Sequence, residues 1–447
     1  MKTVDDDLTN GQIKLWIYQF GVLSNLTWPF LVHDLPLSLA NELDVIANRY
    51  LKKWAGLFKR ADLGTLYRSH QRFGLALTAP STHFKKMGIV KSMLLKHSPD
   101  ENVRKLYQDR EERESKFKTV WRASSLCSSI ENSAIHYSKF CGQTDTIGIG
   151  HNRYKSKPSI AELRRLSPKT MSSIVDEKLW GHSHTLDMQG LWTTWFEHTR
   201  PLDFSWKTLI FGPGKRIISF LLNATINSIP SPFLLRLMNQ QKSAKCKLCS
   251  ISNCNTSHIL AGCNVALTSK RYTWRHDSVL LTLKPELENR VNSQNKSPIR
   301  DNILVKSIHI SNSFIKAGSN TTSTVSKSID RNILSTANDW KLLVDFDHDH
   351  IVFPPEILST DQRPDIIIWS RKTKMVLLIE LTVPADENIQ AAQIRKKARY
   401  DELSREINSV SSWNTKIITI EVGARGFVGK SMNSCLRKLG FKVHFSS

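Results

Sequence analysis

Two apolar segments near the C-terminal end of the chain carry one carboxylate each. Asp365 opens DIIIW, and Glu380 lies inside MVLLIELTV, in the stretch from Arg363 to Pro384. A strand that is apolar on both faces is usually buried, and a buried carboxylate is costly unless a cation pairs with it. The polar turn SRKTK joins the segments as a hairpin, so we expect Asp365 and Glu380 to lie side by side at one end of a sheet.

A helix over residues 386–410 brings a lysine to the same place. Residues at spacings of three and four share one helix face, and Lys396 falls on the apolar face that points at the sheet. Asp386, after Pro384, is expected to cap this helix. The face consists of Ile389, Ala392, Lys396, Tyr400, Leu403 and Ile407.

This constellation predicts metal-dependent phosphodiester hydrolysis. Two adjacent carboxylates suit Mg²⁺ or Mn²⁺, which activates water and neutralises phosphate charge, and a lysine stabilises the transition state or orients the water. Simpler roles remain open for each residue alone. Asp365 suits a strand-end turn, Glu380 suits a buried ion pair with Lys396 or Arg399, and Lys396 suits a side chain that extends its charged end to solvent.

A cysteine-rich stretch, CKLCSISNCNTSHILAGC, supplies a second site; we call it the knuckle (Cys246–Cys263). Two residues separate the first two cysteines, eight more precede His258, and four more precede Cys263. Three thiolates and one imidazole form a closed, structural zinc site, while Cys254 fits no regular spacing and is a spare thiol. The alternative is a set of buried free thiols. The predicted zinc ligands are Cys246, Cys249, His258 and Cys263.

Composition indicates a polyanionic partner. The 447 residues include 63 Lys plus Arg against 40 Asp plus Glu, a formal charge of +23. Nucleic acid is favoured over an anionic membrane, because no long basic amphipathic helix stands out and neither apolar stretch, 16–32 or 217–235, resembles a spanning helix. A solvated basic surface is the alternative. With no leader-like start, we expect a soluble, intracellular protein.

The chain divides into a helical region, the knuckle and a compact α/β domain, which makes it a multidomain α + α/β protein. Residues 1–240 have mainly helical periodicity, and the tryptophans between 180 and 206 are assigned to core packing. A helix is expected over 274–292 and polar linker sequence after it. From residue 340 the pattern predicts strands at KLLVDF, HIVF, DIIIW, MVLLIELTV and TKIITIEVG. GARGFVGKS has the wrong spacing for a phosphate-binding loop, and DFDHDH (Asp345–His350) is expected to be a hairpin turn.

In this order, the pieces resemble the C-terminal half of a non-LTR retrotransposon polyprotein of the class with a restriction-like endonuclease. Similar stretches include WIYQFGVLSNLTWPFLVHDLPLSLANELD, RFGLALTAPSTHFKKMGIVKSMLL, HILAGCNVALTSKRYTWRHDSVL and VFPPEILSTDQRPDIIIWS. The resemblance implies a reverse-transcriptase thumb-like remnant at 1–60 and a helical linker region at 61–240. It further implies a CCHC knuckle with its following helix at 241–292, a polar linker at 293–336 and a PD-(D/E)XK-type endonuclease domain at 337–447.

The same resemblance implies roles for individual residues. Asp365 and Glu380 are expected to bind magnesium or manganese, with Lys396 as the catalytic lysine that has moved from the strand position of Thr382 to the helix. Lys397 is its rival, and Tyr400 is expected to help position the substrate. Nucleic-acid contacts are expected from Arg275 and His276, which with Asp277 form an Arg-His-Asp motif, and from Arg363 and Arg399.

The family implies a nuclear protein that nicks DNA to prime synthesis from element RNA. No polymerase palm precedes the helical region, since DDD at Asp5–Asp7 lacks its context, so reverse transcription by this chain alone is not expected. The chain is then a truncated element, a gene fragment or a domesticated remnant. The rival hypothesis is a non-catalytic, zinc-containing nucleic-acid-binding protein with a degenerate nuclease fold.

Overall fold

The computed structural model describes residues 1–115, 122–123, 125–128, 160–212, 214–297, 332–346 and 352–441. The chain forms two compact units, residues 1–193 with 201–240, and residues 194–200 with 241–447. In the described part of the chain, no helix is long and apolar enough to cross a membrane.

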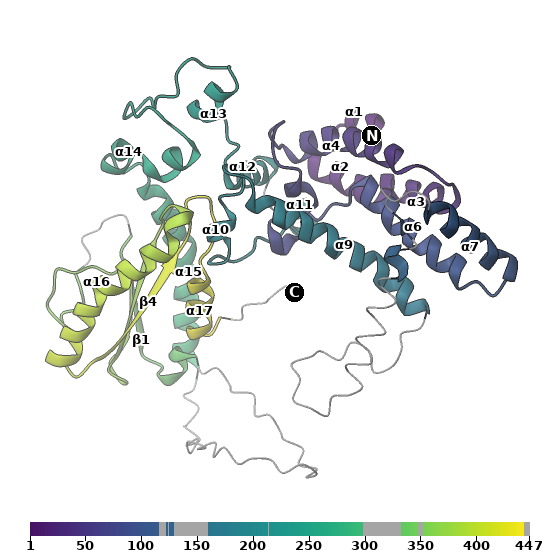
Figure 1. Ribbon diagram of the computed structural model, residues 1–447. Coiled ribbons are helices and arrows are strands. Elements are labelled where there is room, and N and C mark those ends of the chain that lie inside the picture. Colours follow the sequence, from purple (N-terminus) through teal and green to yellow (C-terminus); the bar gives the residue numbers. More distant parts are fainter. Residues whose placement is uncertain are drawn as a thin grey trace, which may run out of the picture. The chain divides into compact units, whose positions relative to one another are not determined.

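The first unit is helical, as the periodicity predicts (Figure 1). No strand occurs among its described residues. Its helices are α1 (Lys2–Asp6), α2 (Gly11–Ile17), the π-helix η1 (Tyr18–Val22), α3 (Leu23–Val32), α4 (Leu37–Ala55), α5 (Gly64–Tyr67), the 3₁₀ turn η2 (His70–Arg72), α6 (Pro80–Lys96), α7 (Glu101–Ser115), α9 (Ile160–His184), α11 (Trp206–Phe211), α12 (Lys215–Thr225) and α13 (Pro232–Leu237).

A buried arginine ties the first unit together. Arg68 is fully buried, donates from Nη1 to Asp62 Oδ2 at 2.8 Å and lies 4.9 Å from the ring centroid of Trp192. Trp192 is itself only 1% exposed. The assignment of this tryptophan to core packing rather than to base stacking is therefore confirmed.

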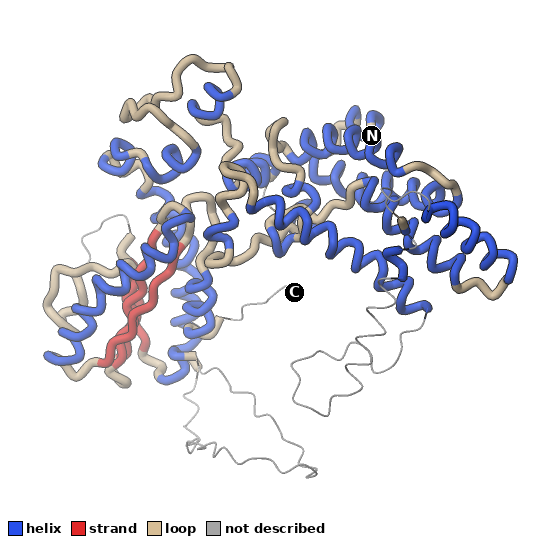
Figure 2. Tube along the Cα trace, in the orientation of Figure 1, coloured by secondary structure: helices blue, strands red, loops and turns tan. Residues whose placement is uncertain are grey.

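The second unit contains a four-stranded sheet in the order β1-β2-β3-β4 (Figure 2). The first three strands are antiparallel, and β4 runs parallel to β3. The described elements are α10 (Thr193–Phe196, of which Thr193 belongs to the first unit), the π-turn η3 (His258–Gly262), α14 (Asn264–Thr268), α15 (Thr273–Lys296), η4 (Ile333–Thr336), β1 (Trp340–Val344), β2 (Ile366–Ser370), β3 (Met375–Thr382), η5 (Asp386–Asn388), α16 (Ile389–Val410), β4 (Asn414–Glu421) and α17 (Lys430–Lys438).

Helices cover both faces of this sheet, so β2 and β3 are apolar on both sides. On one face, α15 and α17 pack on alternate strand residues such as Ile368 and Leu377. On the other face, α16 packs on Ile367 and Leu378. The arrangement is visible in Figure 1, where α16 and the pair α15 and α17 flank the strands. The coarse expectation of helical and α/β parts is thus confirmed, and α15 belongs to the same core as the sheet.

One local strand prediction is wrong, one helix prediction is confirmed with a longer helix, and other predicted segments lie largely outside the described residues. Val352 and Phe353 are not in a strand, because Pro354 and Pro355 remove the backbone donors that a strand needs; Phe353 instead fills the core beneath α16. The helix expected over 274–292 runs from Thr273 to Lys296. Much of DFDHDH and of the polar linker, and residues 116–121 of the charged helix, lie outside the described residues.

Asp386 does not cap α16. The N-cap residue is Asn388, without a side-chain cap, and Asp386 lies in the preceding turn η5 with 0% exposure. Its carboxylate accepts from Arg425 instead. An ion pair with a residue nearly forty positions away has overridden the local capping preference.

The helical unit is predicted to lose stability in mild acid through His83. Burial lowers the pKa of His83 to about 4, and the nearby charge of Lys86 lowers it further. Because the folded pKa is below the unfolded value of about 6.5, the stability is complete above that value and is lost as the pH falls toward 4. After allowance for solvent screening, we expect the free energy of unfolding to fall by about 1–2 kcal/mol.

Urea unfolding of the wild type and of His83→Gln at neutral pH and near pH 5 measures this effect. The wild type should lose more stability on acidification than the variant, in which glutamine keeps a partner for the Thr27 hydroxyl, 2.9 Å from the histidine ring. Equal losses in the two proteins would show that His83 is not the sensitive group.

Candidate metal centre and carboxylate site

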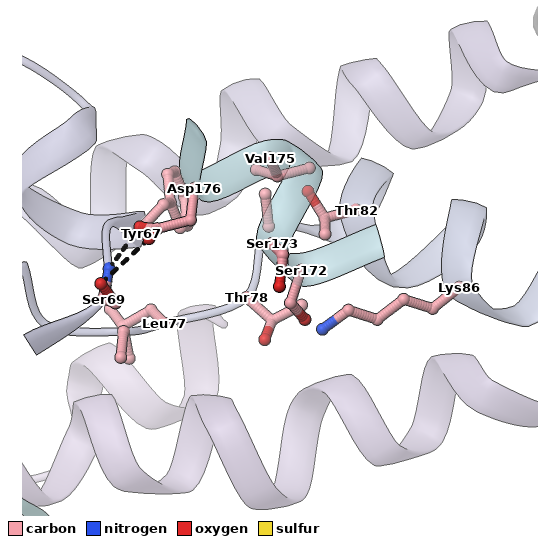
Figure 3. Close-up of a pocket in the computed structure, with 12 residues that line it drawn as sticks. Tyr67, Ser69, Leu77, Thr78, Thr82, Lys86, Ser172, Ser173, Val175 and Asp176 are labelled. Carbon is pink, nitrogen blue, oxygen red and sulfur yellow. Dashed lines mark hydrogen bonds between the residues drawn. The ribbon is translucent and has the colours of Figure 1, made fainter. Parts of the chain in front are cut away.

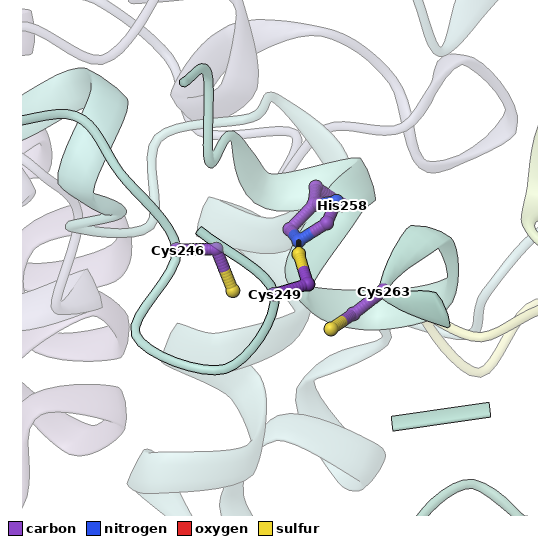
Figure 4. Close-up of side chains that lie close together, drawn as sticks. All are labelled: Cys246, Cys249, His258 and Cys263. Carbon is purple, nitrogen blue, oxygen red and sulfur yellow. Dashed lines mark hydrogen bonds between the residues drawn. The ribbon is translucent and has the colours of Figure 1, made fainter. Parts of the chain in front are cut away.

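The four predicted zinc ligands converge. One ligand atom from each of Cys246, Cys249, His258 and Cys263 lies within 4.8 Å of all the others, and Cys249 Sγ is 3.3 Å from His258 Nε2. Figure 4 shows the four side chains pointing into one space, two from the Cys-x-x-Cys turn and two from either end of η3. Three thiols and one imidazole at this spacing match a tetrahedral zinc site. The cluster can therefore bind a metal such as zinc.

The electrostatics of the knuckle favour a thiolate at its centre. Backbone N–H groups of Cys249 and Leu248 lower the pKa of Cys246 to about 6. Cys254 lies outside the ligand set, and burial followed by the neighbouring thiols raises its pKa to about 11. This thiol packs against the other cysteines of the knuckle but stays outside the ligand set, as expected of a spare thiol.

The start of α15 holds the knuckle in place. The Tyr272 hydroxyl donates to Ile259 O at 2.9 Å, and the Arg275 guanidinium donates to Leu260 O and stacks on the Tyr272 ring at 5.0 Å. Arg275 was expected to contact nucleic acid. In the structure its charged end contacts the backbone of η3, so it joins α15 to the Cys/His cluster.

The predicted pairing of Asp365 with Glu380 has the expected geometry. Ile366 pairs with Ile379 in the β2–β3 hairpin, which places the two carboxylate residues opposite each other one position further along. The Asp365 N–H donates to Glu380 Oε2 at 3.4 Å, and Leu381 N–H donates to Asp365 Oδ2 at 2.7 Å. Backbone N–H donors thus orient both carboxylates where β2 begins.

Glu380 is the most buried charge of this group, at 4% exposure. Burial raises its pKa, and the negative charge of Asp365 raises it further, while Lys396 and Tyr400 oppose these effects. The Lys396 ammonium contacts Glu380 Oε1 directly. We define the carboxylate site as Asp365, Glu380 and Lys396.

The helix face predicted for α16 is confirmed. Ile389, Ala392, Tyr400, Leu403 and Ile407 are buried, and Lys396 reaches Glu380 from the same side. Lys397, the rival lysine, is exposed. The Tyr400 hydroxyl donates to Arg363 O at 3.2 Å and so fixes the chain just before Asp365. The hydroxyl oxygen of Thr382, at the strand position of the common motif lysine, is buried and has no hydrogen-bond partner among the described residues.

His276 reaches the carboxylate site, which the sequence did not predict. Its Nε2 lies 3.3 Å from Asp365 Oδ1, and its Nδ1 lies 3.3 Å from Asp277 Oδ1. Burial lowers the pKa of His276, but the hydrogen bond and charge of Asp365, aided by Asp277, outweigh burial and raise it to about 8. In the sequence, only the Arg-His-Asp motif singled out His276, and this motif gave no indication of its contact with Asp365.

A buried arginine connects the knuckle to the loops beside the carboxylate site. Arg425 donates to Asp386 Oδ2 at 2.9 Å, to Glu387 Oε1 at 3.0 Å and to Ser257 Oγ at 3.1 Å. Ser257 immediately precedes the ligand His258. Glycine is needed at position 423, because a Cβ there would lie 1.8 Å from Asp386 Oδ1. The sequence stretch containing Arg425 forms the turn between β4 and α17, and nothing in its pattern revealed this network.

The remaining predicted nucleic-acid residues are on the surface. Arg363 is exposed at the entrance to β2, and Arg399 is exposed on α16 beside the Tyr400 ring. Both side chains lie within a few residues of the carboxylate site in sequence, which suits contacts to a bound phosphate chain. Their role stays a prediction.

Comparison with known proteins identifies no family. No protein-family model matches the chain, and a search of curated proteins finds no significant relative.

The knuckle is predicted to bind one zinc ion per chain. Cys263→Ser removes one of four ligands and should abolish stoichiometric zinc, because a structural site needs a closed coordination shell. Cys254→Ser is the matched control and should retain zinc. Metal analysis by mass spectrometry after purification without added zinc measures both. Equal zinc in the two variants would contradict the assigned ligand set.

Arg425→Met is predicted to destabilise the second unit by about 3–5 kcal/mol, because the change leaves Asp386 buried and unpaired. Arg405→Met is the control: Arg405 is an exposed arginine of α16, and its loss should cost less than about 0.5 kcal/mol. Urea unfolding followed by circular dichroism measures both. Similar small losses would show that the Arg425 network contributes little.

Proposed function

We propose that this chain is a metal-dependent DNA endonuclease of the kind found in non-LTR retrotransposon proteins with a restriction-like endonuclease. The observation that carries the proposal is the carboxylate site. A buried glutamate, an adjacent aspartate and a lysine from the next helix meet at the end of a mixed sheet that helices cover on both faces.

The donor set fits a divalent cation. Asp365 and Glu380 would hold Mg²⁺ or Mn²⁺, since hard oxygen donors suit these ions and two adjacent carboxylates repel each other without a cation between them. When bound, the ion supplies charge neutralisation at the phosphate and an activated water. No third carboxylate joins this pair among the described residues.

The chain's own residues supply the rest of the chemistry. Lys396 now contacts Glu380, and its ammonium is placed to stabilise charge on the phosphate oxygens once a substrate competes for it. The backbone N–H of Leu381 keeps one oxygen of Asp365 oriented, and Tyr400 holds the backbone of Arg363. Arg363 and Arg399 would grip the flanking phosphates.

The knuckle and the basic charge fit a nucleic-acid substrate. With a formal charge of +23, the chain is expected to bind DNA, and element RNA in the proposed family, with affinity that falls steeply with salt. The closed ligand set of the knuckle makes its zinc structural. A nuclear location follows from the proposed work on chromosomal DNA.

One observation favours a second candidate, a non-catalytic nucleic-acid-binding protein. Each carboxylate already has a cationic neighbour, Lys396 for Glu380 and His276 for Asp365. Charges matched in this way can persist as structural ion pairs after loss of catalysis. In this case the ion pair with Lys396 alone accounts for the buried charge of Glu380, without a metal.

Nicking of supercoiled plasmid with Mg²⁺ or Mn²⁺ separates the candidates. We expect Asp365→Asn to abolish nicking and Lys396→Met to slow it about 10²–10³-fold, whereas Lys397→Met, the exposed neighbour on α16, should nick within a few-fold of the wild type. A gel shift with the same DNA serves as a folding and binding control.

Two results would count against the nuclease. Nicking that survives Asp365→Asn would come from another source. An absence of nicking in the wild type, with an intact gel shift, would support the binding protein.

A further inference from the structure

A pocket in the helical unit is separate from the knuckle and the carboxylate site. Its volume is about 290 Å³, and it lies among the loop after α5, the start of α6 and the middle of α9. Figure 3 shows the Lys86 side chain extending into it toward Thr78 and Ser172. This volume is at the lower end of the range for ligand pockets, about 300–1,000 Å³, and suits a single nucleotide better than a large cofactor.

Lys86 has no counter-ion among the described residues. No described residue forms a hydrogen bond or an ion pair with its ammonium. Burial lowers the pKa of Lys86, and no carboxylate opposes that effect. A bound anion would compensate a half-buried cation that has no partner among the described residues, so Lys86 is a candidate anion contact.

The one carboxylate in the pocket is already matched. Asp176 accepts from Ser69 N–H at 2.7 Å and from the Ser69 hydroxyl at 3.0 Å, and Arg72 lies 3.4 Å away. Asp176 therefore holds the loop wall and leaves the charge of Lys86 uncompensated.

The other walls offer a polar rim and an apolar floor. The Thr82 hydroxyl has no hydrogen-bond partner among the described residues and is free to donate. Ser172 and Ser173 donate to carbonyls of their own helix at 3.0 and 3.1 Å, so their oxygens face a ligand as acceptors. Leu77 and Val175 supply apolar surface. A phosphate beside Lys86 and Thr82, with a sugar or base edge donating to the serines, uses all of these groups.

Further lysines favour a polymer over a free nucleotide. Lys85 precedes Lys86 on α6, and Lys178 lies two residues after Asp176 on α9, although neither lysine lines the pocket itself. Burial lowers the pKa of Lys85, the positive charge of Lys178 lowers it further, and Asp44 opposes both effects. Lysines that flank a one-nucleotide pocket suit contacts to the neighbouring phosphates of a chain.

We propose that the Lys86 pocket binds one nucleotide of a single-stranded nucleic acid, with the phosphate at Lys86 and Thr82. The site lies entirely within the helical unit. It does not depend on the nuclease activity proposed above.

Binding of fluorescein-labelled single-stranded RNA and DNA, followed by anisotropy, tests this site. The full-length chain carries Asp365→Asn throughout, so that cleavage cannot affect the result. Lys86→Met should weaken binding about 5–10-fold and reduce the slope of log affinity against log salt by about one. Lys91→Met is the control, since Lys91 is on the same helix but pairs with Asp34 at 2.9 Å; it should weaken binding less than about twofold.

Stability separates a binding role from a structural one. Lys86→Met should keep or raise the melting temperature, because the change removes a desolvated and unpaired charge. Lys86→Arg keeps the charge and should retain most of the affinity. Equal affinities for Lys86→Met and Lys91→Met would overturn the proposal.

A final arm distinguishes the polymer from a free nucleotide. Adenosine monophosphate should compete with the labelled strand only weakly, because it makes one phosphate contact and not several. Competition at micromolar concentration, lost in Lys86→Met, would instead show a mononucleotide site and contradict the proposal.

Discussion

The burial of Glu380 beside Asp365 is the constraint on which the second unit depends. A glutamate with 4% exposure next to a second carboxylate is tolerated only with a cation within reach. Lys396 on α16 supplies this cation. Its contact with Glu380 depends on the β2–β3 register and on the direction of α16. It also depends on the hydrogen bond from Tyr400 to the chain just before Asp365. A one-residue slip of β3 would turn Glu380 to the opposite face of the sheet, away from Lys396.

The knuckle is joined to this arrangement at two points. Arg275 holds the backbone of η3 at the start of α15, and the next residue, His276, contacts Asp365. Arg425 binds Ser257 of the knuckle together with Asp386 and Glu387, just before α16. A metal ion bound by the knuckle would therefore stabilise the same two helices that bring His276 and Lys396 to the carboxylates. The Cys/His cluster and the carboxylate site are thus linked through shared elements.

The parts of this architecture that were predictable come from periodic patterns. Apolar runs indicated β2, β3 and β4, and the spacing of three and four residues placed Lys396 on the buried face of α16. The cysteine and histidine spacing indicated the metal cluster. Short-range periodicity encodes these features, because the side chains that matter lie on one element or on a hairpin.

The features that were missed depend on contacts between residues distant in the sequence. Capping preference placed Asp386 at the start of α16, but Arg425 draws its carboxylate into the core. The Arg-His-Asp motif gave no indication that Arg275 contacts the backbone of η3 or that His276 contacts Asp365; the predicted nucleic-acid role of both residues stays a prediction. One miss is local instead: the apolar residues of HIVF suggested a strand, although the two prolines that follow are a local signal against it. The contacts of Asp386, Arg275 and His276 have no such local signal.

The most direct test of the account is whether manganese binds at the carboxylate site in a crystal of the wild-type protein soaked with Mn²⁺. The account predicts an anomalous peak between the carboxylates of Asp365 and Glu380, about 2.1 Å from an oxygen of each, with Lys396 moved off Glu380. Zinc in the knuckle of the same crystal serves as the internal control. A knuckle that holds zinc beside a carboxylate site without manganese, with Lys396 still on Glu380, would contradict the account and leave Glu380 as a structural ion-pair partner.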